Sequence, residues 1–327
     1  MKKKIIIFCP NNSETGGVEC LHQLCDVLRS NNIDAYMYYY KKSSYESIPN
    51  QYRQYNIKVL EKFKDDSSQL VVLPEIFCEH MFLFKKSVVF IWWLSIDNYF
   101  KYCFSNMNII SKTKHILKSI LNSSIKYKFK FENLNSNVQH LCQSQYAKEF
   151  LLKKSVNLSK THMLNDYINE VYTTPSQTNK IIKKDIVLYN PKKGFQYTEK
   201  IIKTNPDINF IPLINYTKEE LYDLFKTAKV YIDFGNHPGR DKIPREACAL
   251  DCIIFVGRSG SAMNDIDVPI GSTFKIDFED FHPIEIGNNI RLSFSDYYDL
   301  VNDFKSYKSI ILKDKEVFVQ QTLSIFK

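Results

Sequence analysis

The sequence predicts an α/β protein of two doubly wound domains, and three observations lead to this prediction. The chain has 327 residues, more than a single hydrophobic core usually serves, so two domains are expected. Both halves alternate short apolar runs with polar stretches of helical pattern, which is typical of parallel sheets wound with helices. Hydrophobic residues make up 44% and charged residues 24%, as in an ordinary globular protein.

The elements of the first half follow one another in strand and helix pairs. A strand at 4–9 precedes a helix at 18–30, and a second strand follows at 35–40. The remaining predicted elements are strands at 70–73, 88–93 and 138–142 and a helix at 145–153. The stretch T-T-P-S-Q-T-N-K at 173–180 has the composition of a linker, so we place the domain boundary there.

The second half restarts the same alternation. Its predicted strands lie at 186–189, 209–213, 230–234 and 253–256, and its predicted helices lie at 198–204, 218–227 and 244–250. From Ser293 onward the pattern is helical. We therefore expect a first domain at 1–172, a second at 173–300 and a C-terminal helix at 301–327 that packs back on the first domain.

Composition limits the location and the partners. The apolar run at 5–8 is too short for a signal peptide, and the run at 88–96 is too short to span a bilayer, so we expect a cytoplasmic protein. The eight cysteines include no C-x-x-C pair, which favours reduced, buried thiols over zinc ligands or disulfides.

The segment from Tyr231 to Val256 carries the strongest functional signal. A strand ends at Phe234, a loop with Gly235, His237, Gly239, Arg240 and Lys242 follows, and a helix opens near Pro244. Free backbone N–H groups at that helix start, together with Arg240 and Lys242, favour an anion such as a diphosphate. Glu246 can accept hydrogen bonds from a ribose diol. The alternative is a surface turn in which Glu246 only complements the helix dipole.

This segment resembles the GT-B glycosyltransferases, in particular the retaining, group 1-like enzymes of bacterial surface-polysaccharide synthesis. The matching residues are Pro244, Glu246, Ala247 and Ala249. The resemblance implies two Rossmann-like domains facing a central cleft, with Glu246 on the ribose of a nucleotide-sugar donor. The family places a second glutamate where this chain has Pro238. His237 or Asp241 is then expected to supply the polar contact to the sugar, and His237 is a catalytic candidate.

Two further segments fit the donor side of this resemblance. Lys192 and Lys193 follow the strand at 186–189, where basic residues point into the ligand crevice and suit a phosphate; a solvated lysine pair is the alternative. Asn215 and Tyr216 follow the strand at 209–213, where these enzymes often recognise the base.

The first half offers a glycine turn and an aromatic pair. Gly16 and Gly17, in G-G-V-E, resemble the glycine turn that approaches donor phosphates in GT-B enzymes; a plain strand-to-helix turn is the alternative. Trp92 and Trp93 are expected to stack on an acceptor sugar, and core packing is their alternative. Asp97 is the candidate catalytic base, in competition with Glu19, His22 and Glu75.

The net charge of +8 is concentrated in one insertion. Residues 98–131 contain no Asp or Glu and seven lysines, which lie between Lys101 and Lys130 inclusive. A basic amphipathic segment suits an anionic membrane surface, which would make the protein peripheral at the inner face of the membrane. A solvated helix face is the alternative.

The sequence therefore predicts a glycosyltransferase that moves sugar from a nucleotide-sugar donor to a glycan or lipid-linked acceptor. Lys192, Arg240, Lys242 and the helix start near Pro244 are expected to stabilise the departing diphosphate in place of a metal, so neither a metal nor a cofactor is expected. A non-catalytic sugar-nucleotide-binding protein and a GT-B sugar-nucleotide epimerase remain the alternatives. Without a recognised reading motif, nucleic-acid binding is disfavoured.

Overall fold

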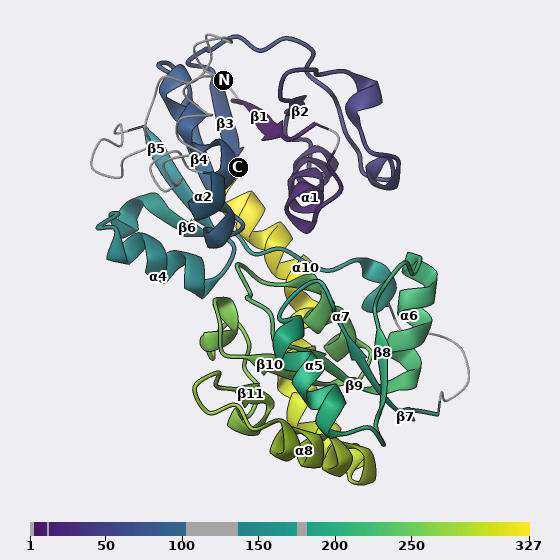
Figure 1. The fold of residues 1–327 in the computed structure, drawn as a ribbon. Helices are drawn as coiled ribbons and strands as arrows, with labels where there is room; N and C mark the ends of the chain where they lie inside the picture. Colours follow the sequence, from purple (N-terminus) through teal and green to yellow (C-terminus); the bar gives the residue numbers. More distant parts are fainter. Residues whose placement is uncertain (1–2, 12, 103–136, 175–181) are drawn as a thin grey trace, which may run out of the picture. The chain divides into compact units, whose positions relative to one another are not determined.

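The computed structural model describes residues 3–11, 13–102, 137–174 and 182–327, which form two compact α/β units (Figure 1). The first unit comprises Met1–Asp166 and Val317–Lys327, and the second comprises Tyr167–Glu316. The chain therefore passes from one unit to the other a few residues before the expected boundary at 172. Apart from Lys101, the lysines of the basic insertion lie outside the described residues.

The first unit contains a six-stranded parallel sheet of order β2-β1-β3-β4-β5-β6. Its strands are β1 (Lys4–Cys9), β2 (Ala35–Tyr39), β3 (Gln69–Pro74), β4 (Val88–Trp93), β5 (Val138–Cys142) and β6 (Thr161–Met163). The predicted strands are present, and β6 adds an edge that the polar sequence T-H-M did not reveal. Ile5, Ile6 and Ile7 are fully buried, as both faces of a parallel sheet must be.

The helices of this unit are α1 (Gly16–Ser30), α2 (Ile96–Tyr102) and α4 (Gln145–Lys153), with a 3₁₀ segment η3 (Glu75–Leu83) after β3. Side-chain caps set two of the helix starts. Thr15 Oγ1 accepts from the backbone N–H of Val18 at the start of α1, and Ser144 Oγ accepts from that of Ala147 at the start of α4. Within the described residues no helix is long and apolar enough to cross a bilayer.

The second unit contains a five-stranded parallel sheet of order β11-β10-β9-β7-β8. Its strands are β7 (Lys184–Tyr189), β8 (Asn209–Pro212), β9 (Ala228–Asp233), β10 (Ile253–Gly257) and β11 (Lys275–Ile276). Its helices are α5 (Phe195–Thr204), α6 (Lys218–Thr227), α7 (Lys242–Ala249), α8 (Pro283–Ser295) and α9 (Tyr297–Leu300), and α10 (Lys305–Phe326) begins in it. Right-handed crossovers place α5 on one face and α6 and α7 on the other. The described structure thus confirms the α/β class and the doubly wound pattern.

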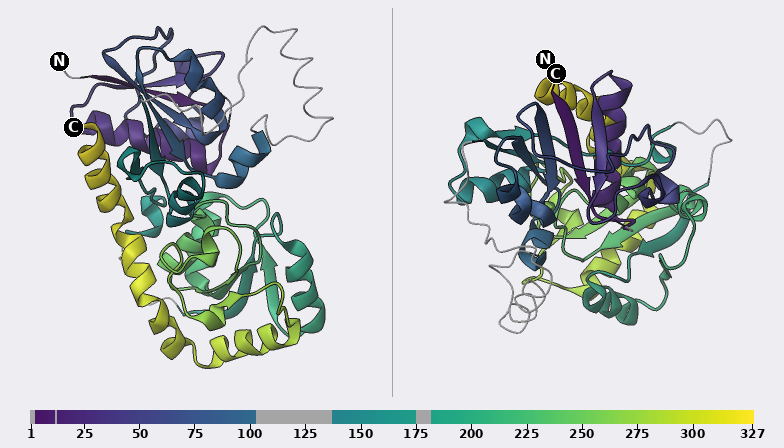
Figure 2. Two further views of the ribbon diagram at one scale, coloured as in Figure 1. Left: turned by 90° about the vertical axis from the view of Figure 1, so that its left-hand side faces the viewer. Right: turned by 90° about the horizontal axis from the view of Figure 1, so that it is seen from above.

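The last turns of α10 complete the core of the first unit. Phe318 stacks on Trp92 with ring centroids 6.1 Å apart, and Phe326 packs on Phe90 at 5.2 Å. Gln321 Oε1 accepts from the backbone N–H of Asn165 at 2.8 Å. The C-terminal residues, in yellow, lie beside the strands of this unit in both views of Figure 2.

A half-buried lysine, Lys183, joins the ends of two helices in the second unit. Lys183 Nζ donates to the carbonyl oxygens of Phe225 at 2.9 Å, Ala228 at 2.8 Å and Leu250 at 2.6 Å. These carbonyls lie at the C-terminal ends of α6 and α7, where backbone oxygens lack helical partners. The ammonium also complements the negative ends of both helix dipoles.

Glu75 is a buried carboxyl at the carboxyl end of β3. It is 3% exposed, and its Oε2 accepts from the backbone N–H of Leu94, just before α2, at 3.1 Å. Burial raises the pKa of Glu75 from its ordinary value of 4.5 to about 8. Between these two values the folded protein binds a proton that the unfolded chain releases.

Replacing Lys183 by Met removes the charged donor shared by three backbone carbonyl oxygens, of which those of Phe225 and Ala228 also accept from Cys252 Sγ. We expect Lys183→Met to lower the free energy of unfolding by roughly 3 kcal/mol, measured by urea denaturation. Lys203→Met is the control, because Lys203 forms an exposed pair with Glu199 on α5. Its effect should stay within about 0.5 kcal/mol, and equal losses in the two variants would contradict the role given to Lys183.

The raised pKa of Glu75 predicts a pH dependence with a definite sign. Because the folded state binds the extra proton, the free energy of unfolding should fall as the pH rises from 4.5 to 8, by up to about 1.4 kcal/mol per pH unit. Glu75→Gln cannot ionise and should lose this part of the slope. Urea denaturation of both proteins across that range tests it, and parallel stability curves would count against a buried, protonated Glu75.

Candidate functional site

A pocket of about 500 Å³ opens at the carboxyl ends of three neighbouring strands of the second unit. Its walls come from the segments that follow β7, β9 and β10, with one aromatic ring from the segment after β11. The lining residues are Lys193, Gly194, Gln196, Tyr197, Phe234, Gly235, Asn236, Pro238, Ser259 and Phe278. The chain leaves β7 toward β8 on one side and returns as β9 on the other, so the pocket lies at a topological switch point, where open α/β sheets bind ligands.

The loops after β7 and β9 touch through their backbones. Gly194, the N-cap of α5, has a φ of +59°, and a Cβ on it would lie 2.1 Å from the carbonyl oxygen of Phe234. Only glycine fits both this left-handed conformation and this approach. The contact holds the start of α5 against the loop that follows β9.

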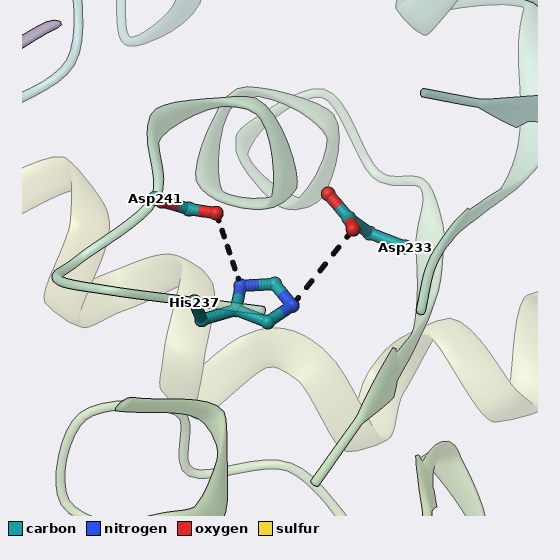
Figure 3. A group of neighbouring side chains, drawn as sticks. All are labelled: Asp233, His237 and Asp241. Atoms are coloured by element: carbon teal, nitrogen blue, oxygen red, sulfur yellow. Dashed lines mark ion pairs between the residues drawn. The ribbon is translucent and has the colours of Figure 1, made fainter. Parts of the chain in front are cut away.

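Beside this contact, Asp233, His237 and Asp241 form a cluster in which the imidazole lies between two carboxylates (Figure 3). His237 Nδ1 is 3.3 Å from Asp241 Oδ2, and Nε2 is 4.0 Å from Asp233 Oδ1. Lys193 Nζ donates to Asp241 Oδ2 at 2.5 Å. The cluster therefore links the pocket-lining lysine to the end of β9.

The same three side chains are a set that could hold a divalent cation, since one ligand atom from each lies within 4.8 Å of the others. The carboxylates already have partners, however. Asp233 Oδ1 accepts from the N–H of Gly235 at 2.9 Å, and Oδ2 accepts from the hydroxyl of Tyr231 at 3.0 Å. Asp241 pairs with the Lys193 ammonium, which occupies the position of a counter-cation. The donor set fits a metal in type, but both carboxylates already accept hydrogen bonds from the protein, and that of Asp241 pairs with a cation.

Two predicted residues of this loop lie elsewhere than expected. His237 is 2% exposed and does not line the pocket, so in this structure its ring packs the loop rather than facing a ligand. Arg240 was expected on a phosphate, but its Nη2 donates to both carboxylate oxygens of Asp314 at 3.0 Å. A guanidinium committed to a buried carboxylate does not face the pocket.

The remaining donor-side residues lie at the carboxyl edge of the same sheet. Lys192 is exposed, and Gly239 is buried, with its carbonyl oxygen accepting from Ser261 Oγ at 2.6 Å. Lys242 and Glu246 are half-buried in α7, which begins two residues before the expected Pro244. Lys193 alone of these predicted residues lines the pocket.

The predicted base-recognition pair follows β8. Asn215 has a φ of +60°, which asparagine tolerates, and both Asn215 and Tyr216 are exposed. They lie at the carboxyl end of the edge strand and outside the pocket lining.

In the first unit, the predicted acceptor platform is wrong. Trp92 and Trp93 are 0% exposed; the indole N–H of Trp92 donates to the carbonyl of Leu164, and that of Trp93 donates to His140 Nδ1. Their ring faces pack inside the core, so no sugar can stack on them.

Of the other predicted residues of the first unit, the glycine turn and Asp97 remain accessible, whereas Glu19 and His22 are buried. Gly16 is exposed and Gly17 half-buried in the first turn of α1, and Asp97 is half-buried in the first turn of α2. The competing carboxyl of Glu75 is buried as described above. The position of Asp97 is compatible with the predicted role as catalytic base but does not test it.

Several residues of the site gave little sequence signal. Asp233 could have been noticed, because a carboxylate inside the buried run V-Y-I-D-F must have partners. Ser259, Phe278 and Asp314 reach the site or its supporting contacts from distant segments, and no local pattern marks them. Tyr197 lies on an amphipathic helix whose apolar face gave no hint of a pocket.

No protein-family model matches the sequence, and no curated protein matches it. Solved structures are similar over the whole chain. Sucrose-phosphate synthase from Thermosynechococcus elongatus superposes with a TM-score of 0.66 at 11% identity, covering 99% of this chain and 98% of that one. Anabaena Alr3699/HepE, in complex with UDP and glucose, gives 0.65 at 10% identity and 99% coverage of both chains.

A glycosyltransferase from Rickettsia africae ESF-5 gives a TM-score of 0.63 at 12% identity, covering 100% of this chain and 98% of that one. At this level of sequence identity, the similarity establishes the fold but does not identify the residues of the site. The three alignments each cover at least 98% of this chain and of the similar chain. The chain therefore has the fold of the GT-B glycosyltransferases.

Proposed function

We propose that the protein is a glycosyltransferase whose second unit binds a nucleotide-sugar donor in the pocket at the ends of β7, β9 and β10. The observation that carries this proposal is the position of that pocket at the switch point of a doubly wound sheet, beside the Lys193 ammonium and the start of α5. The full-length likeness to a protein solved with UDP and with UDP-glucose supports a donor of this class.

Three groups suit the departing nucleoside diphosphate. Lys193 offers an ammonium at the pocket, and the first turn of α5 offers backbone N–H groups without helical partners. Glu246 in α7 suits the ribose diol. Charge developing on the diphosphate is then stabilised by fixed protein groups, without a metal.

Transfer to a glycan or lipid-linked acceptor in surface-polysaccharide synthesis completes the proposal. Asp97, on the first unit, is the base that activates the acceptor hydroxyl. The basic segment from Lys101 to Lys130 holds the protein at an anionic membrane surface, at the cytoplasmic face. The roles of Asp97 and of the basic segment are inferred from the sequence pattern.

One observation favours a second candidate, a non-catalytic sugar-nucleotide-binding protein. Pro238 lines the pocket where the family motif has a glutamate, and proline offers neither a carboxylate nor an N–H to a sugar. Incubation with nucleotide-sugars separates the two: release of nucleoside diphosphate, by hydrolysis or transfer, supports the enzyme, and binding without release supports the binding protein.

Nucleotide binding should depend on Lys193 and Glu246. Isothermal titration with UDP, GDP, CMP and their sugars should identify a ligand, and Lys193→Met and Glu246→Ala should each weaken it by about tenfold or more. Lys203→Met, at the opposite end of α5, should leave affinity unchanged. If the wild-type protein binds none of these nucleotides or nucleotide-sugars, the proposal is wrong.

Donor binding should not require a divalent cation. Because Lys193 already balances Asp241, we expect the same nucleotide-sugar affinity and the same release of nucleoside diphosphate in EDTA as in Mg²⁺ or Mn²⁺. Restoration of activity by a metal after EDTA treatment, and its loss in His237→Ala, would instead make the Asp233, His237 and Asp241 cluster a metal site.

A further inference from the structure

A buried carboxylate on α10 bonds to two arginines, one in the loop that lines the pocket and one in the helix that follows it. Arg240 ends the stretch of loop after β9, and Arg245 lies in α7; both bond to Asp314, from Nη2 of Arg240 at 3.0 Å and from Nη1 of Arg245 at 3.2 Å. Arg245 and Asp314 are each 1% exposed. All three residues belong to the second unit.

Arg245 also bonds to the backbone of the loop. Its Nη2 donates to the carbonyl oxygen of Arg240 at 2.7 Å, and its Nε donates to that of Asp241 at 3.2 Å. The guanidinium thus spans the Asp314 carboxylate and two consecutive peptide groups. A planar fork of donors is well suited to fixing a backbone in this way.

The loop from Phe234 to Asp241 forms much of the pocket wall. Phe234, Gly235, Asn236 and Pro238 line the pocket, and Asp241 pairs with Lys193. On its other side, the loop is held by Ser261, whose N–H donates to the carbonyl of His237 at 2.8 Å and whose hydroxyl donates to that of Gly239. A shift of the loop would therefore displace both the pocket wall and the lysine partner.

The position of the loop depends on the negative charge of Asp314. A carboxylate out of contact with water is stable only when paired, and removing its charge takes away the anion to which both buried guanidinium groups bond. Their repulsion would act directly on the loop, because one arginine belongs to it and the other bonds to its carbonyls.

We propose that Asp314 is a positioning residue for donor binding: through Arg240 and Arg245 it fixes the loop 234–241 in its binding conformation, without touching the ligand. This role rests on the proposed function, since the bound ligand is the nucleotide-sugar. Through Asp314, α10 then contributes to donor affinity, although it lies far from the loop in the sequence.

The test uses the full chain with Asp314→Asn, which keeps the shape of the side chain and removes its charge. Hydrogen exchange, read by mass spectrometry without ligand, should show amides 235–241 exchanging about tenfold faster or more, while amides of β9 and β10 keep wild-type protection. The affinity for the UDP, GDP or CMP compound that the wild type binds should fall about tenfold or more. A purely global loss of stability would speed exchange in the strands as well and would overturn the proposal.

Two further variants keep the test decisive. Arg240→Met leaves the Arg245 pair in place and should shift both measurements in the same direction by about threefold or more, even if Asp314→Asn does not fold. Lys308→Met is the matched control, because it removes another ion pair of α10, with Asp251, away from the loop. Loop exchange and affinity in Arg240→Met equal to those of the control would overturn the proposal.

The two proposals can fail separately. If the wild-type protein binds none of these nucleotides, the proposed function fails and the exchange measurement alone decides the role of Asp314. Faster exchange confined to 235–241 then supports the hold on the loop, and unchanged exchange overturns it.

Discussion

The parallel direction of the strands in the second unit is the constraint on which its site depends. Because β7, β9 and β10 run the same way, the segments that follow them emerge at one edge of the sheet and can share a pocket. The interior of the sheet is apolar, since residues such as Val230, Ile232 and Phe255 are fully buried, and the carboxylate of Asp233 lies only at the end of β9. The pocket is therefore lined mainly by the loops at this edge, whose backbones must be held by contacts of their own.

Those contacts are unusually close for surface loops. Besides Gly194 against Phe234, Gly260 has a φ of +58°, and a Cβ there would lie 2.0 Å from the carbonyl oxygen of His237. The loops after β7, β9 and β10 are therefore packed side by side through two glycines. Backbone packing sets the positions of the loops, and side-chain ion pairs such as that of Lys193 with Asp241 add to it.

The sequence predicted elements better than it predicted contacts. A buried strand such as 253–256 is recognisable because an apolar run rich in β-branched residues is a local pattern, and the strand predicted at 138–142 begins and ends where expected. Trp92 and Trp93 show the limit: an aromatic pair at a strand end suits a sugar platform or a core, and only the arrival of Phe318 from the C-terminus decides it. Arg240 was misread for the same reason, because its partner Asp314 lies in a helix whose own pattern is unremarkable.

The course of α10 has a consequence for the synthesis of the protein. The first unit is discontinuous, since residues 317–327 belong to it and all of the second unit intervenes. During translation, strands β1 to β6 leave the ribosome long before the ring of Phe318 that covers Trp92. The first unit must wait with an open apolar surface while the second, continuous in sequence, is completed. Premature termination within α10 would leave that surface uncovered and prone to aggregation.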